Sequence, residues 1–148
     1  MSKPTVAIGN DHAGTDLKER IINEYSSQFE FINHGTNGSS SVDYPDYVHP
    51  VAQDVESEKA IFGILICGSA NGVCMTANKH KGIRAGLAWN KEVAKLIKQH
   101  NNANIICLPA RFLEEDEALE VLQTYVDEKF EGGRHQNRIN KIAVSNNE

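Results

Sequence analysis

The chain of 148 residues carries 15 Lys and Arg against 20 Asp and Glu, a formal net charge of −5, which argues against nucleic acid as a partner because general nucleic-acid binders are usually basic. Hydrophobic residues make up 40% and charged residues 24%, so the composition predicts one globular domain over residues 1–148 and excludes a disordered chain. No apolar run approaches the ~18 residues of a membrane span, and the first residues contain no apolar signal core, so we expect a cytoplasmic protein without membrane contact. The three cysteines form no C-x-x-C pair, so we expect neither a disulfide framework nor a zinc ribbon.

Five short apolar runs typical of buried strands alternate with segments of helical spacing. The runs predict strands at Thr5–Gly9, Phe29–Ile32, Ile61–Cys67, Arg84–Ala88 and Asn104–Leu108. Helices between them are indicated by Leu17, Ile21, Ile22 and Tyr25, then by Val48, Val51, Ala52 and Val55, then by the short segment Val73–Lys79, then by Val93, Leu96 and Ile97, and then by Ala118, Val121, Leu122, Tyr125 and Val126. The alternation predicts an α/β fold, a doubly wound five-stranded parallel sheet of Rossmann-like or flavodoxin-like type with both faces covered.

A last helical segment follows Gly132-Gly133 and lies outside the five strand–helix repeats. Its apolar residues are Ile139, Ile142 and Ala143. We expect an extra C-terminal helix whose apolar stripe covers a surface elsewhere, such as a partner subunit. Arg134 and Arg138 are four residues apart and share one face of such a helix, where they either grip a phosphate together or form a solvated basic helix start.

Ligands of doubly wound folds bind beyond the carboxyl ends of the strands, so the segments after the strands predict the site. These segments are Asn10–Gly14, His34–Thr36 with the later Asp43–Pro45, Cys67–Gly72, Trp89-Asn90 and Pro109–Arg111. Reactive residue types gather in them, although loops are polar in any protein. We therefore expect the chemistry at this one edge of the sheet.

The turn after the third strand carries the most chemical information. Cys67 ends an apolar strand, a loop of small residues follows, and a helix begins near Val73. The backbone N–H groups of such a loop hold an anion, and their positive field favours the thiolate of an adjacent cysteine, which then acts as a base or nucleophile. On placement alone Cys67 is equally a buried strand cysteine, and burial without chemistry is expected for Cys74 and Cys107.

Other motif-based interpretations fail. The loop lacks the arginine of a cysteine phosphatase, six residues after Cys67, and the chain has neither G-x-G-x-x-G nor G-x-x-x-x-G-K-[ST]. The histidines show no zinc spacing; they are His12, His34, His49, His80, His100 and His135. Although the adjacent Asp11 and His12 could reach a metal, none is expected. His100, which precedes a polar loop, is either a solvent-exposed or a catalytic histidine.

Seven short stretches, in chain order across nearly the whole chain, form a specific set. They are Ile8–Gly14, Asp43–Pro45, Gly63–Ser69, Ala77–Lys79, Gly82–Ala85, Gln99–Asn104 and Glu131–His135. Together they resemble the type B ribose-5-phosphate isomerases of the ribose/galactose-6-phosphate isomerase family. The resemblance implies interconversion of ribose 5-phosphate and ribulose 5-phosphate through a cis-enediolate, a step of the non-oxidative pentose phosphate pathway. It also implies a sugar-phosphate substrate, no metal or organic cofactor, and a homodimer that is sometimes paired into a tetramer.

The resemblance implies a role for each matching residue. Cys67 matches the base that moves a proton between the first two carbons, and His100 matches the histidine that opens the furanose ring. The amides that match the anion hole for the enediolate are those of Gly68, Ser69, Ala70, Asn71, Gly72 and Val73, with the Ser69 hydroxyl serving the sugar oxygens. Asp11 and Asn101 match residues that contact sugar hydroxyls, and Tyr44 and His135 match further site residues. The residues that match the phosphate clamp are His12, Arg111, Arg134 and Arg138.

Some positions depart from the family pattern. One branch uses a glutamate five residues after Gly68 in place of the cysteine, and Val73 at that position groups this chain with the cysteine branch, whereas Asn71 looks more like the glutamate branch. Ala70 replaces a usual glycine, which would strain the loop if this residue takes a positive φ. The alternatives are an isomerase of a six-carbon aldose 6-phosphate of allose or galactose type, and a non-catalytic phosphate-binding α/β module.

Each active site is expected to combine two subunits. The resemblance points to the neighbouring subunit as the surface that the C-terminal helix covers, in a two-fold dimer with two equivalent sites. We expect Cys67, His100 and the small-residue loop to come from one chain, and Arg134 and Arg138 from the other.

Overall fold

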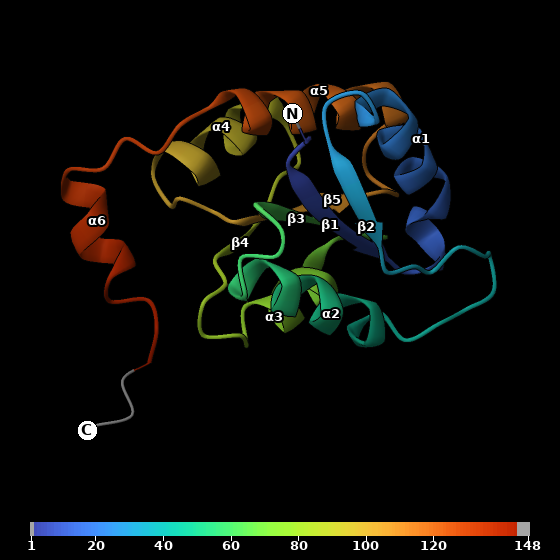
Figure 1. Ribbon diagram of the computed structural model, residues 1–148, viewed down its shortest axis with the longest axis horizontal. Coiled ribbons are helices and arrows are strands. Elements are labelled where there is room, and N and C mark those ends of the chain that lie inside the picture. Colours follow the sequence, from blue (N-terminus) through green and yellow to red (C-terminus); the bar gives the residue numbers. More distant parts are fainter. Residues whose placement is uncertain (1, 145–148) are drawn as a thin grey trace.

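Every neighbouring pair of strands in the sheet is parallel, as the sequence pattern predicts. In the computed structural model, which describes residues 2–144, five strands stand in the order β2-β1-β3-β5-β4 (Figure 1). They are β1 (Thr5–Asn10), β2 (Glu30–Asn33), β3 (Phe62–Cys67), β4 (Ala85–Leu87) and β5 (Ile105–Pro109). The predicted strand ends therefore differ from the observed ends by no more than one residue.

Helices cover both faces of the sheet, which confirms the doubly wound fold (Figure 1). They are the 3-10 helix η1 (His12–Gly14), α1 (Thr15–Tyr25), α2 (Pro45–Glu56), α3 (Asn71–Ala77), α4 (Lys91–Gln99), α5 (Glu115–Asp127) and α6 (Arg134–Ile139). The helices α1, α4 and α5 pack on one face, and α2 and α3 pack on the other. None of the helices within residues 2–144 is both long and apolar enough to cross a membrane.

The strands read as continuous apolar runs because each lies between two helical layers. All six residues of β3 are buried, and successive side chains of a strand point to opposite faces. Ile64 and Ile66 pack in the core beneath α1, α4 and α5, whereas Leu65 and Cys67 pack in the core beneath α2 and α3. The end of β3 is thus held on both faces, which fixes the position of Cys67.

The helix α6 stands away from both helical layers (Figure 1). Gly132 and Gly133 precede it with φ of +70° and +58°, a backbone conformation that glycine adopts without strain. The extra C-terminal helix is confirmed, but it is shorter than predicted. It ends at Ile139, so Ile142 lies in the turn beyond it and is 55% exposed. The apolar stripe expected to join Ile139 and Ile142 on one helix is therefore not formed.

The loops after the strands lie at the carboxyl edge of the sheet, and the loops after the helices lie at the amino edge. Because all five strands run in one direction, each helix returns the chain from the carboxyl edge to the amino edge. β1 lies between β2 and β3, so the connection from β1 to β2 and the later connection to β3 run to opposite sides of β1. This change of direction makes a switch point at the carboxyl ends of β1 and β3. Ligands of doubly wound sheets bind at such a point.

Candidate active site

A hollow of about 440 Å³ opens at the carboxyl edge, at the switch point between β1 and β3. It is lined by Asp11, Tyr44, Cys67, Gly68, Ser69, Gly72, Arg111 and Phe112, which we call the carboxyl-edge cluster. All of these except Phe112 are predicted site residues. Phe112 is 74% exposed, and no motif in the sequence points to it.

Cys67 is the last residue of β3 and is 5% exposed. Beyond it, β3 and β5 stay joined, because the Ala110 N–H donates to the Cys67 carbonyl (2.9 Å) and the Arg111 N–H donates to the Gly68 carbonyl (3.0 Å). These bonds hold the Arg111 backbone beside the loop that begins at Gly68. The arrangement places a nearly buried thiol and a guanidinium around one hollow, where a base can act on a bound anionic substrate.

The loop after β3 contains a backbone conformation that favours glycine. Ala70 has φ +66°, so the strain foreseen for alanine at this position is present. The Ser69 Oγ accepts hydrogen bonds from the Asn71 N–H (3.3 Å) and from the Asn71 side-chain amide (3.2 Å). The first backbone bond of α3 returns to the Ala70 carbonyl, so the N–H groups of Gly72 and Val73 lie ahead of the helical ladder and can donate to an anion.

Two glycines let larger side chains lie against this loop. A Cβ at Gly68 would be 3.3 Å from Nη1 of Arg111, and a Cβ at Gly72 would be 2.4 Å from Cζ of Tyr44. The guanidinium and the phenol ring thus occupy space that any other residue would fill. Arg111 and Tyr44 therefore close over the loop from two sides.

The turn after β1 orients Asp11 and His12. One carboxylate oxygen of Asp11 accepts from the Ala13 N–H (2.9 Å) and caps η1, which fixes the Asp11 side chain at the rim of the hollow. The Val42 N–H donates to Nδ1 of His12 (3.3 Å). Because Nδ1 accepts, a neutral His12 carries its proton on Nε2 and can donate it to a phosphate oxygen.

A second hollow, of about 460 Å³, lies between the end of α4 and α6. It is lined by His100, Asn101, Arg134, His135, Arg138, Ile139 and Ile142, which we call the amino-edge cluster. The rings of His100 and His135 stack with their centroids 4.3 Å apart. The arginine pair predicted from the i, i+4 spacing therefore faces the same hollow as His100.

The carboxyl-edge and amino-edge clusters lie at opposite edges of the sheet. His100 follows α4 and precedes β5, and just before β5 the Asn104 carbonyl accepts from the Gly63 N–H near the start of β3 (3.0 Å). Cys67 lies at the other end of β3. The five residues of β5, at about 3.3 Å each, separate the two edges by roughly 16 Å. The expectation that one chain brings Cys67 and His100 to one site is therefore wrong, because α4 carries the chain back across the sheet before His100.

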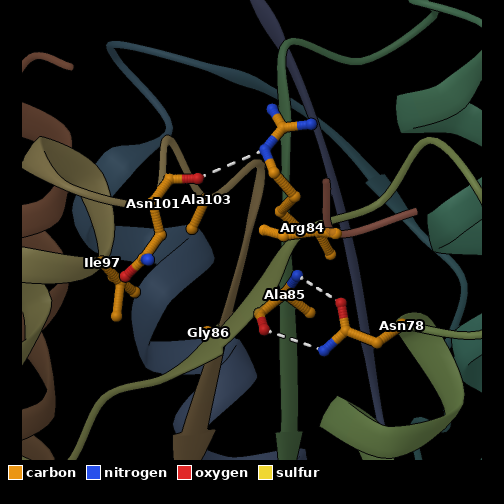
Figure 2. Close-up of a pocket in the computed structure, with 8 residues that line it drawn as sticks. Asn78, Arg84, Ala85, Gly86, Ile97, Asn101 and Ala103 are labelled. Atoms are coloured by element: carbon orange, nitrogen blue, oxygen red, sulfur yellow. Dashed lines mark hydrogen bonds between the residues drawn. The ribbon is translucent and has the colours of Figure 1, made fainter. Parts of the chain in front are cut away.

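Arg84 fixes the turn that directly follows His100, and Figure 2 shows its contact with Asn101 in that turn. Its Nε donates to the carbonyls of Asn101 (3.2 Å) and Asn102 (3.0 Å), and its Nη2 donates to the Asn102 carbonyl (2.9 Å). These bonds support Asn102 in a left-handed conformation with φ +46°. The sequence places Arg84 in a predicted strand and in a matching stretch but assigns it no role, because a side chain that binds backbone carbonyls has no partner residue type to recognise.

Glu131 begins one of the matching stretches, but the sequence assigns it no role. Its Oε1 lies 3.8 Å from Nε2 of His100 and 3.5 Å from Nε2 of His135. Burial, together with the nearby His100, holds the pKa of His135 below its usual value. Although His100 and His135 show no zinc spacing in the sequence, the fold brings these three side chains close enough to share a metal ion.

The likeness to known proteins covers nearly the whole chain. The family model described as Ribose/Galactose Isomerase matches residues 6–142. A Mycoplasma genitalium protein named probable ribose-5-phosphate isomerase B is 44% identical over 142 residues, which cover 93% of this chain and 92% of that protein. A crystal structure of a ribose 5-phosphate isomerase from Thermotoga maritima has a TM-score of 0.92 at 42% identity and covers 96% of this chain and 99% of that chain. The structure of ribose-5-phosphate isomerase B from Mycoplasma genitalium with bound ribulose-5-phosphate has a TM-score of 0.91 at 40% identity and covers 96% and 95%.

Proposed function

The chain belongs to the ribose/galactose isomerase family, and we propose that it interconverts ribose 5-phosphate and ribulose 5-phosphate. The observation that carries this proposal is the carboxyl-edge cluster, in which Cys67 shares one hollow with Asp11, Ser69 and Arg111. A cysteine at the end of a buried strand, beside loop amides and a guanidinium, suits proton transfer on a phosphorylated sugar. A module that only binds phosphate needs no such base.

In the proposed mechanism, His100 first opens the furanose ring by donating a proton to the ring oxygen. The bond from C1 to that oxygen breaks, and the C1 hydroxyl releases its proton to solvent as the aldehyde forms. The Cys67 thiolate then removes the proton from C2 of the open-chain aldose and returns it to C1, while the hydroxyl proton moves from O2 to O1. The cis-enediolate carries negative charge on oxygen between these steps. Loop amides, including those of Gly72 and Val73, stabilise that charge, because they donate without reorganising.

The proposed active site requires two copies of the chain. One copy contributes the carboxyl-edge cluster with Cys67, and the other contributes the amino-edge cluster with His100 and Asn101. The separation of the clusters by the length of β5 supports this arrangement, since one sugar phosphate cannot span it. A two-fold homodimer makes two equivalent sites from such halves.

The phosphate clamp is divided in the same way. Arg111, together with His12 in the turn directly after β1, belongs to the copy that supplies Cys67, whereas Arg134 and Arg138 belong to the copy that supplies His100. Guanidinium groups bind phosphate through paired N–H donors, so contributions from both copies hold the substrate across the interface. Asp11 of one copy and Asn101 of the other are proposed to contact the sugar hydroxyls.

A turnover assay of the purified chain tests the proposed activity. Ribose 5-phosphate, allose 6-phosphate and galactose 6-phosphate are compared as substrates, and the ketose product is measured in each case. We expect the highest kcat/KM with ribose 5-phosphate. Preference for either six-carbon substrate would transfer the assignment to that sugar. Binding of all three without turnover would identify a non-catalytic module instead.

A further inference from the structure

The side chains of His100, Glu131 and His135 lie close together at the amino-edge cluster, with no hydrogen bond among them. The Oε1 atom of Glu131 lies 3.8 Å from Nε2 of His100 and 3.5 Å from Nε2 of His135, and all three ligand atoms lie within 4.8 Å of one another. Both nitrogen–oxygen distances exceed those of ordinary hydrogen bonds. The carboxylate thus lies within ion-pair distance of both imidazoles but beyond the length of an ordinary hydrogen bond to either.

These separations match the edges of a zinc coordination tetrahedron. With bonds of about 2.1 Å from zinc to imidazole nitrogen and carboxylate oxygen, tetrahedral ligands stand roughly 3.4 Å apart. The two distances from Glu131 are 3.5 and 3.8 Å. The His100 side chain is 38% accessible, so its ring is free to turn out of the stack with His135 and bring the third ligand to the same spacing.

The ligand set is held by the fold and contains a buried group that lacks a partner. The His135 side chain is only 8% accessible, and among residues 2–144 its Nε2 has no hydrogen-bond partner. The Glu131 N–H donates to the Gln99 carbonyl (3.0 Å), which anchors the carboxylate beside the end of α4. The His100 and His135 rings stack with their planes tilted by 17°, and the Nε2 atoms of both lie near the same carboxylate oxygen. Burying an unpaired polar atom is costly, and a bound cation removes that cost.

We infer that His100, Glu131 and His135 form a zinc site, and that zinc bound there inhibits the isomerase. Two imidazoles and one carboxylate are a recognised donor set for Zn²⁺, and three protein ligands leave the fourth position open to the hollow. Inhibition rests on the proposed function of His100, because zinc occupies the Nε2 atom that would otherwise transfer the ring-opening proton. Zinc binding itself does not depend on that function.

Metal binding is measured first, without reference to activity. The chelator-treated full chain is titrated with Co²⁺ and followed by visible absorption, and Zn²⁺ affinity is obtained by displacing the cobalt. We expect one site per chain with the spectrum of nitrogen and oxygen ligands and without a thiolate charge-transfer band. Glu131→Gln removes one of three ligands and is expected to weaken zinc binding roughly tenfold or more. A thiolate band that disappears in Cys67→Ala would place the metal on the cysteine and overturn the inference.

A second histidine pair provides the matched control. Nδ1 of His49 lies 2.7 Å from Nε2 of His80, and Nδ1 of His80 lies 3.1 Å from a Glu56 carboxylate oxygen. His80→Asn disrupts this pair and is expected to leave zinc affinity unchanged. Loss of binding in His80→Asn with normal binding in Glu131→Gln would relocate the metal and contradict the proposed site.

Inhibition is measured on ribose 5-phosphate, with each variant compared with its own zinc-free rate. We expect zinc to inhibit the wild type reversibly, chelator to restore the rate, and the half-inhibiting zinc concentration to rise roughly tenfold or more in Glu131→Gln. Zinc that binds through Glu131 without slowing turnover would refute the inhibitory part of the inference. If the wild type binds zinc in this way but turns over none of the sugar phosphates, the proposed function fails while the metal site stands.

Discussion

At the scale of single residues, the chemistry rests most directly on Cys67. It is the one cysteine that lines the carboxyl-edge hollow, whereas Cys74 lies on α3 with its thiol near the Ala85 carbonyl (3.4 Å) and Cys107 is fully buried in β5. The three cysteines of the chain therefore differ in environment, although the sequence presents each of them among apolar neighbours. This difference makes a selective test of the base possible.

Replacing Cys67 by Ala is expected to lower kcat by a factor of at least ~100 with little change in KM, because the thiolate acts on the proton and not in binding. Steady-state kinetics in both reaction directions checks this. Iodoacetate should inactivate the wild type, and ribose 5-phosphate should protect it. Cys74→Ala serves as the control and should keep wild-type kinetics and the same rate of inactivation. Turnover close to wild type in Cys67→Ala would refute the assignment of the base.

A second residue-scale prediction concerns stability at alkaline pH. Burial, with smaller contributions from Asp127 and Glu24, raises the pKa of Tyr25 to about 12, while tyrosine in an unfolded chain titrates near 10. Between these values the unfolded chain loses its proton first, so the free energy of unfolding falls as pH rises through this window. Tyr25→Phe should show a shallower fall between about pH 10 and about pH 12 in urea unfolding. An identical slope in the two proteins would contradict the prediction.

At the scale of elements, α2 ends in a conformation that its residue does not favour. Glu58 follows the C-cap Ser57 with φ +63° and is exposed. A left-handed residue at this position closes many helices, but a Cβ there costs roughly 1–2 kcal/mol relative to glycine. Local strain of this kind is separate from the strain at Ala70, where the side chain is fully buried and contributes to the core.

Glu58→Gly is expected to raise the free energy of unfolding by about 1 kcal/mol, since it removes the Cβ clash and no hydrogen bond of the described residues uses the Glu58 side chain. For a chain of this size that corresponds to a rise of roughly 2–4 °C in Tm, measured by calorimetry. Glu58→Ala keeps the Cβ and should show no such gain. A larger gain in Glu58→Ala than in Glu58→Gly would show that the charge, and not the backbone, determines the effect.

At the scale of the whole molecule, the topology separates two sets of reactive side chains and makes self-association part of the proposed chemistry. The carboxyl-edge cluster surrounds the switch point of the sheet, and the amino-edge cluster lies between α4 and α6. Each set contains cationic side chains for the phosphate and lacks the acid–base group of the other. A second copy supplies the missing half.

Mixing two inactive variants tests this division. In a mixed dimer of Cys67→Ala and His100→Asn, one site receives Cys67 from the second chain and His100 from the first, so one intact site forms. After subunit exchange at equal concentrations, activity should return to about a quarter of the wild-type value, since half of the dimers are mixed and each has one intact site. The control mixture of Cys67→Ala with Asp11→Ala damages the same half and should stay inactive. With exchange verified by native mass spectrometry, a mixture of Cys67→Ala and His100→Asn without recovery would rule out the division.

The local pattern of the sequence was sufficient for the five strands and for the residues that follow them, because burial on two faces and loop polarity are properties of neighbouring residues. The i, i+4 spacing added the arginine pair, and the resemblance assigned roles to His100 and Asn101. The strand order with β5 between β3 and β4 was decided by the tertiary structure, since pairing between distant strands leaves no local signal. The separation of His100 from Cys67 was decided in the same way. A helix that returns the chain across a parallel sheet can place two residues of one reaction, such as Cys67 and His100, at opposite edges of the sheet. Only the path of the backbone shows which edge each residue reaches.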